Sequence, residues 1–176
     1  MDIVNYTSWL GRTETHTERL DGWPVRGLRE LLDQPPEAAD ASPAPALAQW
    51  LWFAPLVPQS RIDTDGHPRR GGFLPPVALP RRMWAGSDMG LHRPFVIGDR
   101  VSKTMTIADI SEKQGGSGPL VFVRVENAYR RAADGAPILD ETQILVYRDP
   151  PGAGDPAPRP RPAPEGAAFS RQVSVG

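Results

Sequence analysis

The sequence predicts an α+β fold in which one curved antiparallel β-sheet wraps around a single main helix. Four segments between residues 82 and 148 alternate apolar and polar side chains as half-buried strands do, and short turn sequences separate them. Only one segment, beginning near residue 24, places its apolar residues at helical spacing. Its single apolar stripe must lie against another element, and the sheet offers one apolar face to receive it.

The first elements are an extended segment and the helix. Residues 10–20 alternate threonines with charged residues, which favours a short polar strand or an extended arm. Pro24 suits the first turn of a helix, where its missing N–H costs nothing. The apolar stripe consists of Val25, Leu28, Leu31 and Leu32. The prolines at 35 and 36 end the helix, because the residue before a proline disfavours helical geometry.

Two loops flank an aromatic segment in the middle of the chain. Residues 35–46 are rich in proline and alanine and are expected to form a polar loop. Leu47–Leu56 carries three aromatic residues within four positions and no charge, which predicts a strand buried on both faces, with a short helix as the alternative. Residues 57–80 are rich in proline and glycine, and a loop of that length in a compact domain is usually functional or mobile.

Four strands are expected in the second half of the chain. Gly-Gly-Ser-Gly at 115–118 and Ala-Asp-Gly at 133–135 are turn sequences between them. Three hairpin-like links predict an antiparallel meander. The expected strands are Arg82–His92, Arg100–Glu112, Leu120–Arg130 and Ile138–Arg148. A curved antiparallel sheet around a lone helix is the hot-dog arrangement.

Length and composition predict one globular domain over residues 1–149, followed by a proline-rich linker and tail over 150–176. No apolar run approaches ~18 residues, and the N-terminus lacks the pattern of a signal peptide. We therefore expect a cytoplasmic protein without a membrane partner. The net charge of −1 provides no global field, so no nucleic-acid partner is expected.

The sequence offers few groups for catalysis. There are three histidines and no cysteine, and no two histidines have the spacing of metal ligands, so neither a metal site nor a cofactor is expected. His92 and Asp88 are the best acid–base pair, but four residues of strand separate them by about 13 Å. Direct contact between them is not expected. His92 is interpreted either as an ordinary corner histidine or as a group beside a substrate.

Arginine and tryptophan side chains are candidates for substrate binding. Arg81 and Arg82 are consecutive in a strand, so only one of them can face a given ligand. A guanidinium matches the phosphate oxygens that a coenzyme A thioester carries, although a mixed solvated surface explains the arginines equally. Trp50, Trp52 and Trp84 are candidates to line an acyl pocket, while plain core packing is the alternative for aromatic residues.

Three stretches resemble a known family. They begin as "WLGRTETHTERL" (9–20), "WLWFAPLVPQSR" (50–101) and "EKQGGSGPLVFV" (112–149), and "GGFLPPVALPRRMWAG" (71–86) is the most specific block. These stretches are similar to the N-terminal half of the MaoC-like double-hot-dog hydratases, in particular mesaconyl-CoA hydratase and the type 2 3-hydroxyacyl-thioester dehydratases. In that family a second hot-dog carries the catalytic pair in a motif such as Asp-x-Asn-x-x-His, which this sequence does not contain.

The resemblance implies a noncatalytic, substrate-binding hot-dog half of a 2-enoyl-CoA hydratase or 3-hydroxyacyl-thioester dehydratase. It implies an acyl-CoA or acyl-carrier-protein thioester as ligand and pairing with a catalytic hot-dog subunit, or a homodimer. One alternative is a stand-alone homodimeric dehydratase, or a repurposed enzyme of secondary metabolism, with His92 or Asp88 as the acid–base group. Another is a protein that binds an acyl thioester without transforming it.

Overall fold

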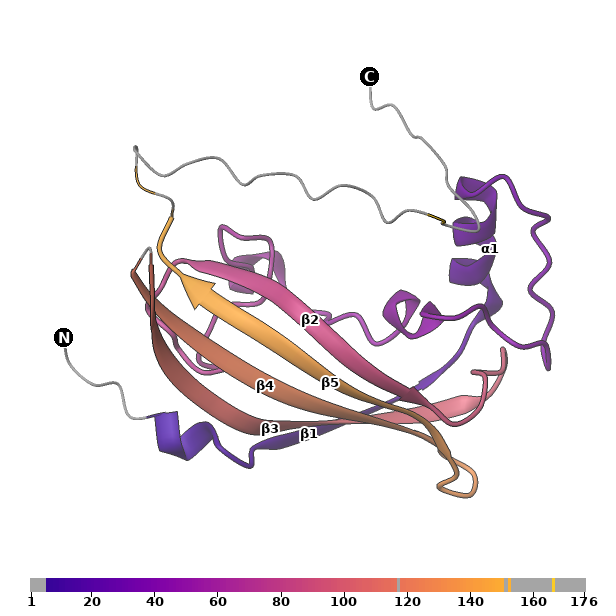
Figure 1. Cartoon of the computed structure of the whole chain (residues 1–176). Coiled ribbons are helices and arrows are strands. Elements are labelled where there is room, and N and C mark those ends of the chain that lie inside the picture. The colour runs from indigo at the N-terminus through magenta and orange to yellow at the C-terminus, as the bar shows by residue number, and fades with distance from the viewer. Residues whose placement is uncertain (1–5, 117, 151, 153–165, 167–176) are drawn as a thin grey trace.

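The computed structural model describes residues 6–116, 118–150, 152 and 166. In these ranges the chain forms a five-stranded antiparallel sheet, one α-helix and short 3₁₀ helices (Figure 1). The expected α+β fold class is therefore confirmed. The predicted linker and tail lie almost entirely outside the described residues. No helix in the described ranges is long and apolar enough to cross a membrane.

All four predicted strands are present near their expected boundaries, and the polar N-terminal segment is a fifth strand. The sheet contains β1 (Thr13–Arg19), β2 (Arg81–Leu91), β3 (Arg100–Gly115), β4 (Gly118–Arg131) and β5 (Pro137–Arg148). The helical elements are η1 (Tyr6–Trp9), α1 (Gly22–Leu31), η2 (Ala48–Leu51) and η3 (Gln59–Arg61).

The strand order is β1-β3-β4-β5-β2, and every neighbouring pair is antiparallel. Hairpins connect β3 to β4 and β4 to β5, as the turn sequences predict. The predicted hairpin between β2 and β3 is wrong, because β2 pairs with β5 at the opposite edge of the sheet. The connection between them buries Phe95 and Ile97 in the core instead of turning tightly.

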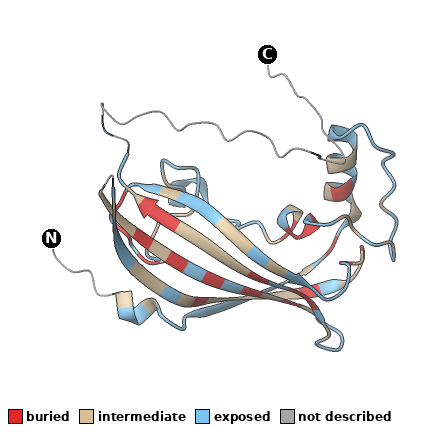
Figure 2. Cartoon of the chain, in the orientation of Figure 1, coloured by how far each residue is buried: buried red, intermediate tan, exposed pale blue. Residues whose placement is uncertain are grey.

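Buried and less buried residues alternate along the strands, so the sheet has a buried, mainly apolar inner face and a more exposed outer face (Figure 2). In β4, Val121, Val123 and Val125 are buried on the inner face, while Arg124 and Glu126 are exposed on the outer face, as predicted. The buried side chains form two apolar clusters. The first contains Leu20, Val25, Ala48, Trp52, Phe95, Ile97, Val101, Tyr129, Ile138 and Leu139. The second contains Val77, Leu79, Ile107, Val121, Val123, Val125 and Tyr147.

Helix α1 lies beside one end of the sheet (Figure 1). Val25 is the buried residue of its apolar stripe, whereas Leu31 is exposed. The Trp52 indole N–H, in the first cluster, donates a hydrogen bond to the Asp21 carbonyl at the start of the helix (3.2 Å). Val25 shares the first apolar cluster with Val101 and Tyr129 of the sheet, so the helix packs on the inner face at that end. Chain segments between α1 and β2 cover the rest of this face.

The aromatic segment does not form the predicted strand. Its centre is the 3₁₀ helix η2, in agreement with the short-helix alternative. Leu47 precedes this helix and Phe53 follows it, with φ angles of 65° and 58°. These angles lie in the left-handed region, which residues other than glycine rarely adopt. The Phe53 N–H donates to the Glu18 carboxylate (3.1 Å). With this backbone, Trp52 is only 6% exposed while Trp50 remains 50% exposed.

Arg70 fixes the long loop of residues 57–80. Its guanidinium donates to the carbonyls of Val77, Leu79 and Pro80 at 2.7, 2.6 and 2.6 Å and lies 5.4 Å from the centre of the Tyr147 ring. These contacts hold Val77 and Leu79 in the second apolar cluster. The loop is therefore a packed cover for the inner face of the sheet.

Replacement of Arg70 tests this anchor. Arg70→Ala is expected to lower the free energy of unfolding by about 2 to 4 kcal/mol, because the three carbonyls lose a charged donor. Arg70→Lys should restore only part of the loss, since an ammonium lacks the planar fork. Arg69→Ala, at the exposed neighbouring position, should change stability by less than about 0.5 kcal/mol. Urea unfolding measures all three variants, and equal losses at positions 69 and 70 would contradict the assignment.

Trp50 and Trp52, near the C-terminal end of η2, provide a second test. Trp52→Ala is expected to cost about 3 to 5 kcal/mol of unfolding free energy, because it empties the core beside Phe95 and removes the tether to α1. Trp50→Ala should cost less than about 1 kcal/mol, since half of its surface already faces solvent. Thermal unfolding followed by circular dichroism distinguishes them. A Trp50 variant as unstable as the Trp52 variant would show that the core has been misassigned.

Candidate functional site

Trp50 on η2 and Trp84 on β2 form an aromatic pair beside an edge of the sheet. Their ring centres are 6.1 Å apart with an angle of 79° between the planes, which is the favourable edge-to-face geometry. The two side chains are 50% and 56% exposed. Trp84 pairs with Leu145 across β2 and β5 and so belongs to the inner face. Paired tryptophans that are neither buried nor scattered are typical of a binding surface.

Trp52, the third tryptophan predicted for the pocket, does not join this pair. It packs in the first apolar cluster, where its ring centre is 6.3 Å from that of Phe95. The structure thus brings together two of the three candidate tryptophans and places the third in the core.

Arg81 and Arg82 point to opposite faces of the sheet, as their consecutive positions predict. The Arg82 side chain is only 8% exposed and forms an ion pair with Asp65 at 3.0 Å. Partial burial raises the pKa of Asp65, but the His67 backbone N–H and the Arg82 charge outweigh burial, so this pKa lies below its ordinary value. Arg82 therefore already has a carboxylate partner. Arg81 is exposed on the outer face and is the better placed of the two for a ligand.

His92 pairs with Asp140 rather than with Asp88. The His92 Nε2 atom lies 2.7 Å from Asp140 Oδ2, and the Arg130 guanidinium lies 2.7 Å from Oδ1. Partial burial raises the pKa of Asp140, but hydrogen bonds from His92 and Arg130 more than offset it, and the net shift is downward. No local sequence pattern predicts this pair, because it depends on the β2–β5 register that sets Gly90 opposite Asp140.

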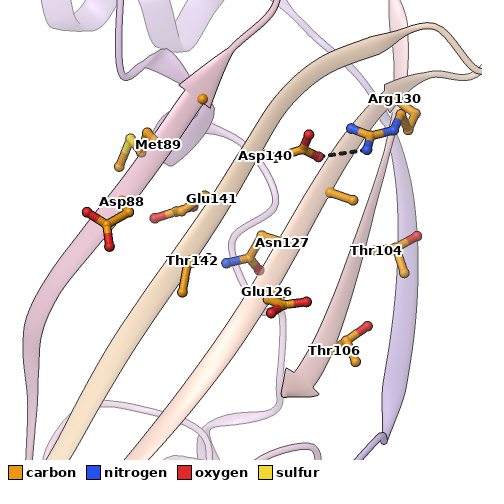
Figure 3. A pocket seen from close by; sticks show the side chains of 12 residues that line it. Asp88, Met89, Thr104, Thr106, Glu126, Asn127, Arg130, Asp140, Glu141 and Thr142 are labelled. Atoms are coloured by element: carbon orange, nitrogen blue, oxygen red, sulfur yellow. Dashed lines mark ion pairs between the residues drawn. The ribbon is translucent and has the colours of Figure 1, made fainter. Parts of the chain in front are cut away.

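Asp88 and Asp140 line an open hollow of about 610 Å³ on the outer face (Figure 3). Its lining combines small residues of neighbouring strands, mainly threonine, glycine and alanine, with the charged side chains of aspartate, glutamate and arginine. The lining residues are Asp88, Met89, Gly90, Thr104, Thr106, Glu126, Asn127, Ala128, Arg130, Asp140, Glu141 and Thr142. His92 and Asp140 are both about half exposed, so water screens this pair. Among the described residues, no three histidine, aspartate or glutamate side chains gather as a metal site.

A buried carboxylate that sequence reasoning missed lies beside the tryptophan pair. Glu141 on β5 is 3% exposed. Its Oε1 atom accepts a hydrogen bond from the Ser87 hydroxyl (2.9 Å), and its Oε2 atom accepts a longer one from the Tyr129 hydroxyl (3.5 Å). The Trp84 indole N–H donates to the same Ser87 oxygen (3.1 Å). Glu141 is thus connected to the Trp84 side chain through one hydroxyl.

Burial shifts the pKa values of two ionisable groups near Glu141, namely Tyr129 and Lys103. Burial is the main cause that raises the pKa of Tyr129, and the Glu141 charge adds to it, so the phenol remains a donor. Burial also lowers the pKa of Lys103, while the charges of Glu141 and Glu18 oppose that shift. Strand alternation contains a sign of this site, because positions 139, 141, 145 and 147 share the inner face and only Glu141 among them carries a charge.

Comparison with known proteins identifies several relatives. Mesaconyl-C(4)-CoA hydratase from Chloroflexus aurantiacus is 40% identical over 161 residues, which cover 91% of this chain and 56% of that protein. The chain thus spans about half the length of this curated relative.

Two solved structures share the fold. A chain of the ChsH1–ChsH2 complex from Mycobacterium tuberculosis matches with a TM-score of 0.58 and 14% identity, over 84% of this chain and 88% of that chain. A chain of the C-terminally truncated HadBC (3R-hydroxyacyl-ACP dehydratase) complex from the same organism matches with a TM-score of 0.50 and 17% identity, over 80% and 98%. Both likenesses concern the fold alone.

The family comparison bears on most of the chain. Residues 47–175 match the family described as hydroxyacyl-thioester dehydratase type 2. This match includes the aromatic segment, the long loop and strands β2 to β5. It confirms the resemblance that the block at residues 71–86 indicates. The chain therefore belongs to the type 2 hydroxyacyl-thioester dehydratase family.

Proposed function

We propose that this chain is the substrate-binding hot-dog half of a 2-enoyl-CoA hydratase or 3-hydroxyacyl-thioester dehydratase, and that it works with a catalytic hot-dog partner. Family membership supports the reaction class. The name of the relative that is 40% identical, mesaconyl-C(4)-CoA hydratase, favours a coenzyme A thioester with a short acyl chain as the ligand. A homodimer of this chain is the alternative assembly.

The observation that carries this proposal is the half-exposed Trp50–Trp84 pair on the inner side of β2. Aromatic walls suit the acyl part of a thioester, because they exclude water without offering hydrogen bonds that the acyl chain cannot return. Arg81 precedes Trp84 by three residues on the same strand, about 10 Å along it. Because Arg81 is on the outer face and Trp84 on the inner face, a ligand with its acyl end against the tryptophans must bend around the start of β2 for a phosphate to reach Arg81.

The free edge of β2 supports pairing with a partner sheet. Among the described strands, β2 has a neighbour on one side only, namely β5. Alternate residues of this eleven-residue strand direct their N–H and C=O groups to the free edge, which forms a template for another strand. In the assembled enzyme, a carboxylate and a histidine of the partner would add water to the double bond or remove it. This chain would supply the acyl wall and the phosphate contact.

A stand-alone dehydratase is the second candidate, because His92 and Asp140 are in hydrogen-bond contact. A histidine held by a carboxylate is a general base of familiar type. Its open position on the outer face favours the first proposal, since acid–base catalysis of this reaction gains from exclusion of water. A purified chain that hydrates crotonyl-CoA by itself, and loses that activity in His92→Ala, would establish the second candidate.

Calorimetric titration of the purified chain with crotonyl-CoA tests the binding role. Trp84→Ala and Trp50→Ala are each expected to raise Kd about tenfold, because the acyl chain loses an aromatic wall. Arg81→Ala should weaken crotonyl-CoA but leave crotonyl-pantetheine, which lacks the nucleotide phosphates, unchanged. Arg124→Ala, exposed on the outer face of β4, serves as the control.

An unchanged Kd in folded Trp50 and Trp84 variants would show that the acyl group does not bind against these tryptophans on the inner face. Equal losses for the two thioesters in Arg81→Ala would show that Arg81 does not contact phosphate. Tight binding without turnover in the presence of catalytic hot-dog partners would favour the remaining alternative, a thioester-binding protein without chemistry.

A further inference from the structure

A β-bulge in β2 brings Trp84 and Ser87 to the same face of the sheet. In a regular strand, residues three apart point to opposite faces. The β2–β5 register pairs Trp84 with Leu145 and Gly86 with Ile144, so Ala85 is the extra residue of the bulge. Beyond it, Ser87 pairs with Gln143 and joins the inner face. The Trp84–Ser87 hydrogen bond of 3.1 Å therefore exists because of this one additional residue.

The direction of each hydrogen bond follows from the chemistry of the groups. An indole N–H can only donate, so the Ser87 oxygen is the acceptor from Trp84. The single hydroxyl proton of Ser87 is then directed to Glu141, 2.9 Å away. A serine hydroxyl that accepts from one side and donates to the other has one rotamer that serves both partners. The chain Trp84–Ser87–Glu141 thus fixes the orientation of the indole plane.

A buried glutamate is unusual, and the orientation of the Trp84 indole through Ser87 would explain its presence. At 3% exposure it has lost nearly all contact with water, which is costly for a carboxylate. Its adjacent residues on that face of β5 are Leu139 and Gln143, and Asn127 lies opposite it on β4, so Glu141 is the charged member of this group. The Ser87 and Tyr129 hydroxyls donate to this carboxylate, and the Lys103 charge also stabilises it. The buried carboxylate is consistent with a positioning role toward the half-exposed Trp84.

Trp84 is also held by Trp50, whose ring meets it edge to face at 6.1 Å. A surface tryptophan without such partners samples several rotamers, and ordering it on ligand binding would cost affinity. With a hydrogen bond at its Nε1 atom and an aromatic contact on its ring, Trp84 is ordered before any ligand arrives. A rigid indole sets a fixed limit to the space that an acyl chain can occupy.

We propose that Ser87 and Glu141 are positioning residues that lock Trp84 as a fixed wall, and that this wall limits the acyl chain of the bound thioester to short lengths. This inference rests on the proposed function, because it assumes that the acyl group lies against Trp84. It goes further by assigning chain-length selection to a buried carboxylate that does not itself touch the substrate.

The lock can be observed without any ligand. In a ¹⁵N-labelled chain, the indole N–H of Trp84 gives its own NMR signal, and Trp84→Phe identifies that signal by its loss. Ser87→Ala is expected to shift it and to speed its hydrogen exchange with water, while the other indole signals remain in place. Ser87→Thr keeps the hydroxyl, so the Trp84 indole signal should keep its wild-type position and exchange rate. Ser111→Ala, on the outer face of β3, is the matched control.

Chain-length selection is measured as the ratio of the affinities for butyryl-CoA and octanoyl-CoA. The wild-type chain should favour butyryl-CoA. Ser87→Ala should reduce that preference about three- to tenfold through tighter binding of octanoyl-CoA, with little change for butyryl-CoA. In a Trp84→Phe background, which has no indole N–H, Ser87→Ala should have no further effect. Glu141→Gln keeps one acceptor oxygen and should change the ratio less than Ser87→Ala.

Two results would overturn the inference and leave the proposed function intact: a Trp84 signal unaffected by Ser87→Ala, or a shifted signal together with an unchanged affinity ratio. If the wild-type chain binds neither thioester, the proposed function fails and chain-length selection fails with it, while the NMR signal still reports the lock. If Ser87→Ala weakens both thioesters equally, the serine is a structural residue of β2 and does not select chain length.

Discussion

The structure depends on one constraint: the inner face of the sheet must be kept from water, and the only α-helix in the described residues lies beside one end of it. The two apolar clusters on that face are completed by segments without regular structure. Each covering segment is fixed at a point where a polar group meets the backbone. Trp52 donates to Asp21 at one end, and Arg70 donates to three carbonyls at the other.

The candidate site follows from how this cover is built. Left-handed backbone at Leu47 and Phe53 forms the short helix that buries Trp52 and leaves Trp50 facing Trp84. From the opposite side, the bulge in β2 sets Ser87 beneath the Trp84 indole and within reach of Glu141. Local departures from ideal helix and strand geometry thus produce the aromatic wall. Such departures are costly, and they cluster at functional sites in many proteins.

Local features of the fold could be read from the sequence, while features that depend on distant pairing could not. Alternation located the strands and placed Arg81 and Arg82 on opposite faces, because period two is a property of each strand alone. The partner of β2 and the His92–Asp140 contact depend on which strands pair, which no local pattern specifies. The segment around Trp50 forms the short-helix alternative and not the predicted strand, because short apolar runs fit strands and helices equally. Alternation places Glu141 on the inner face, but its burial depends on the loops that cover this face, which no local pattern specifies.

We propose that an acyl thioester lies on the inner face against the tryptophan pair. A crystal structure of the chain with a non-hydrolysable analogue of crotonyl-CoA tests this directly. We expect electron density for the acyl group in contact with Trp50 and Trp84, with the nucleotide phosphates reaching Arg81 around the start of β2. An acyl group seated in the outer hollow between Asp88 and Asp140 would contradict it.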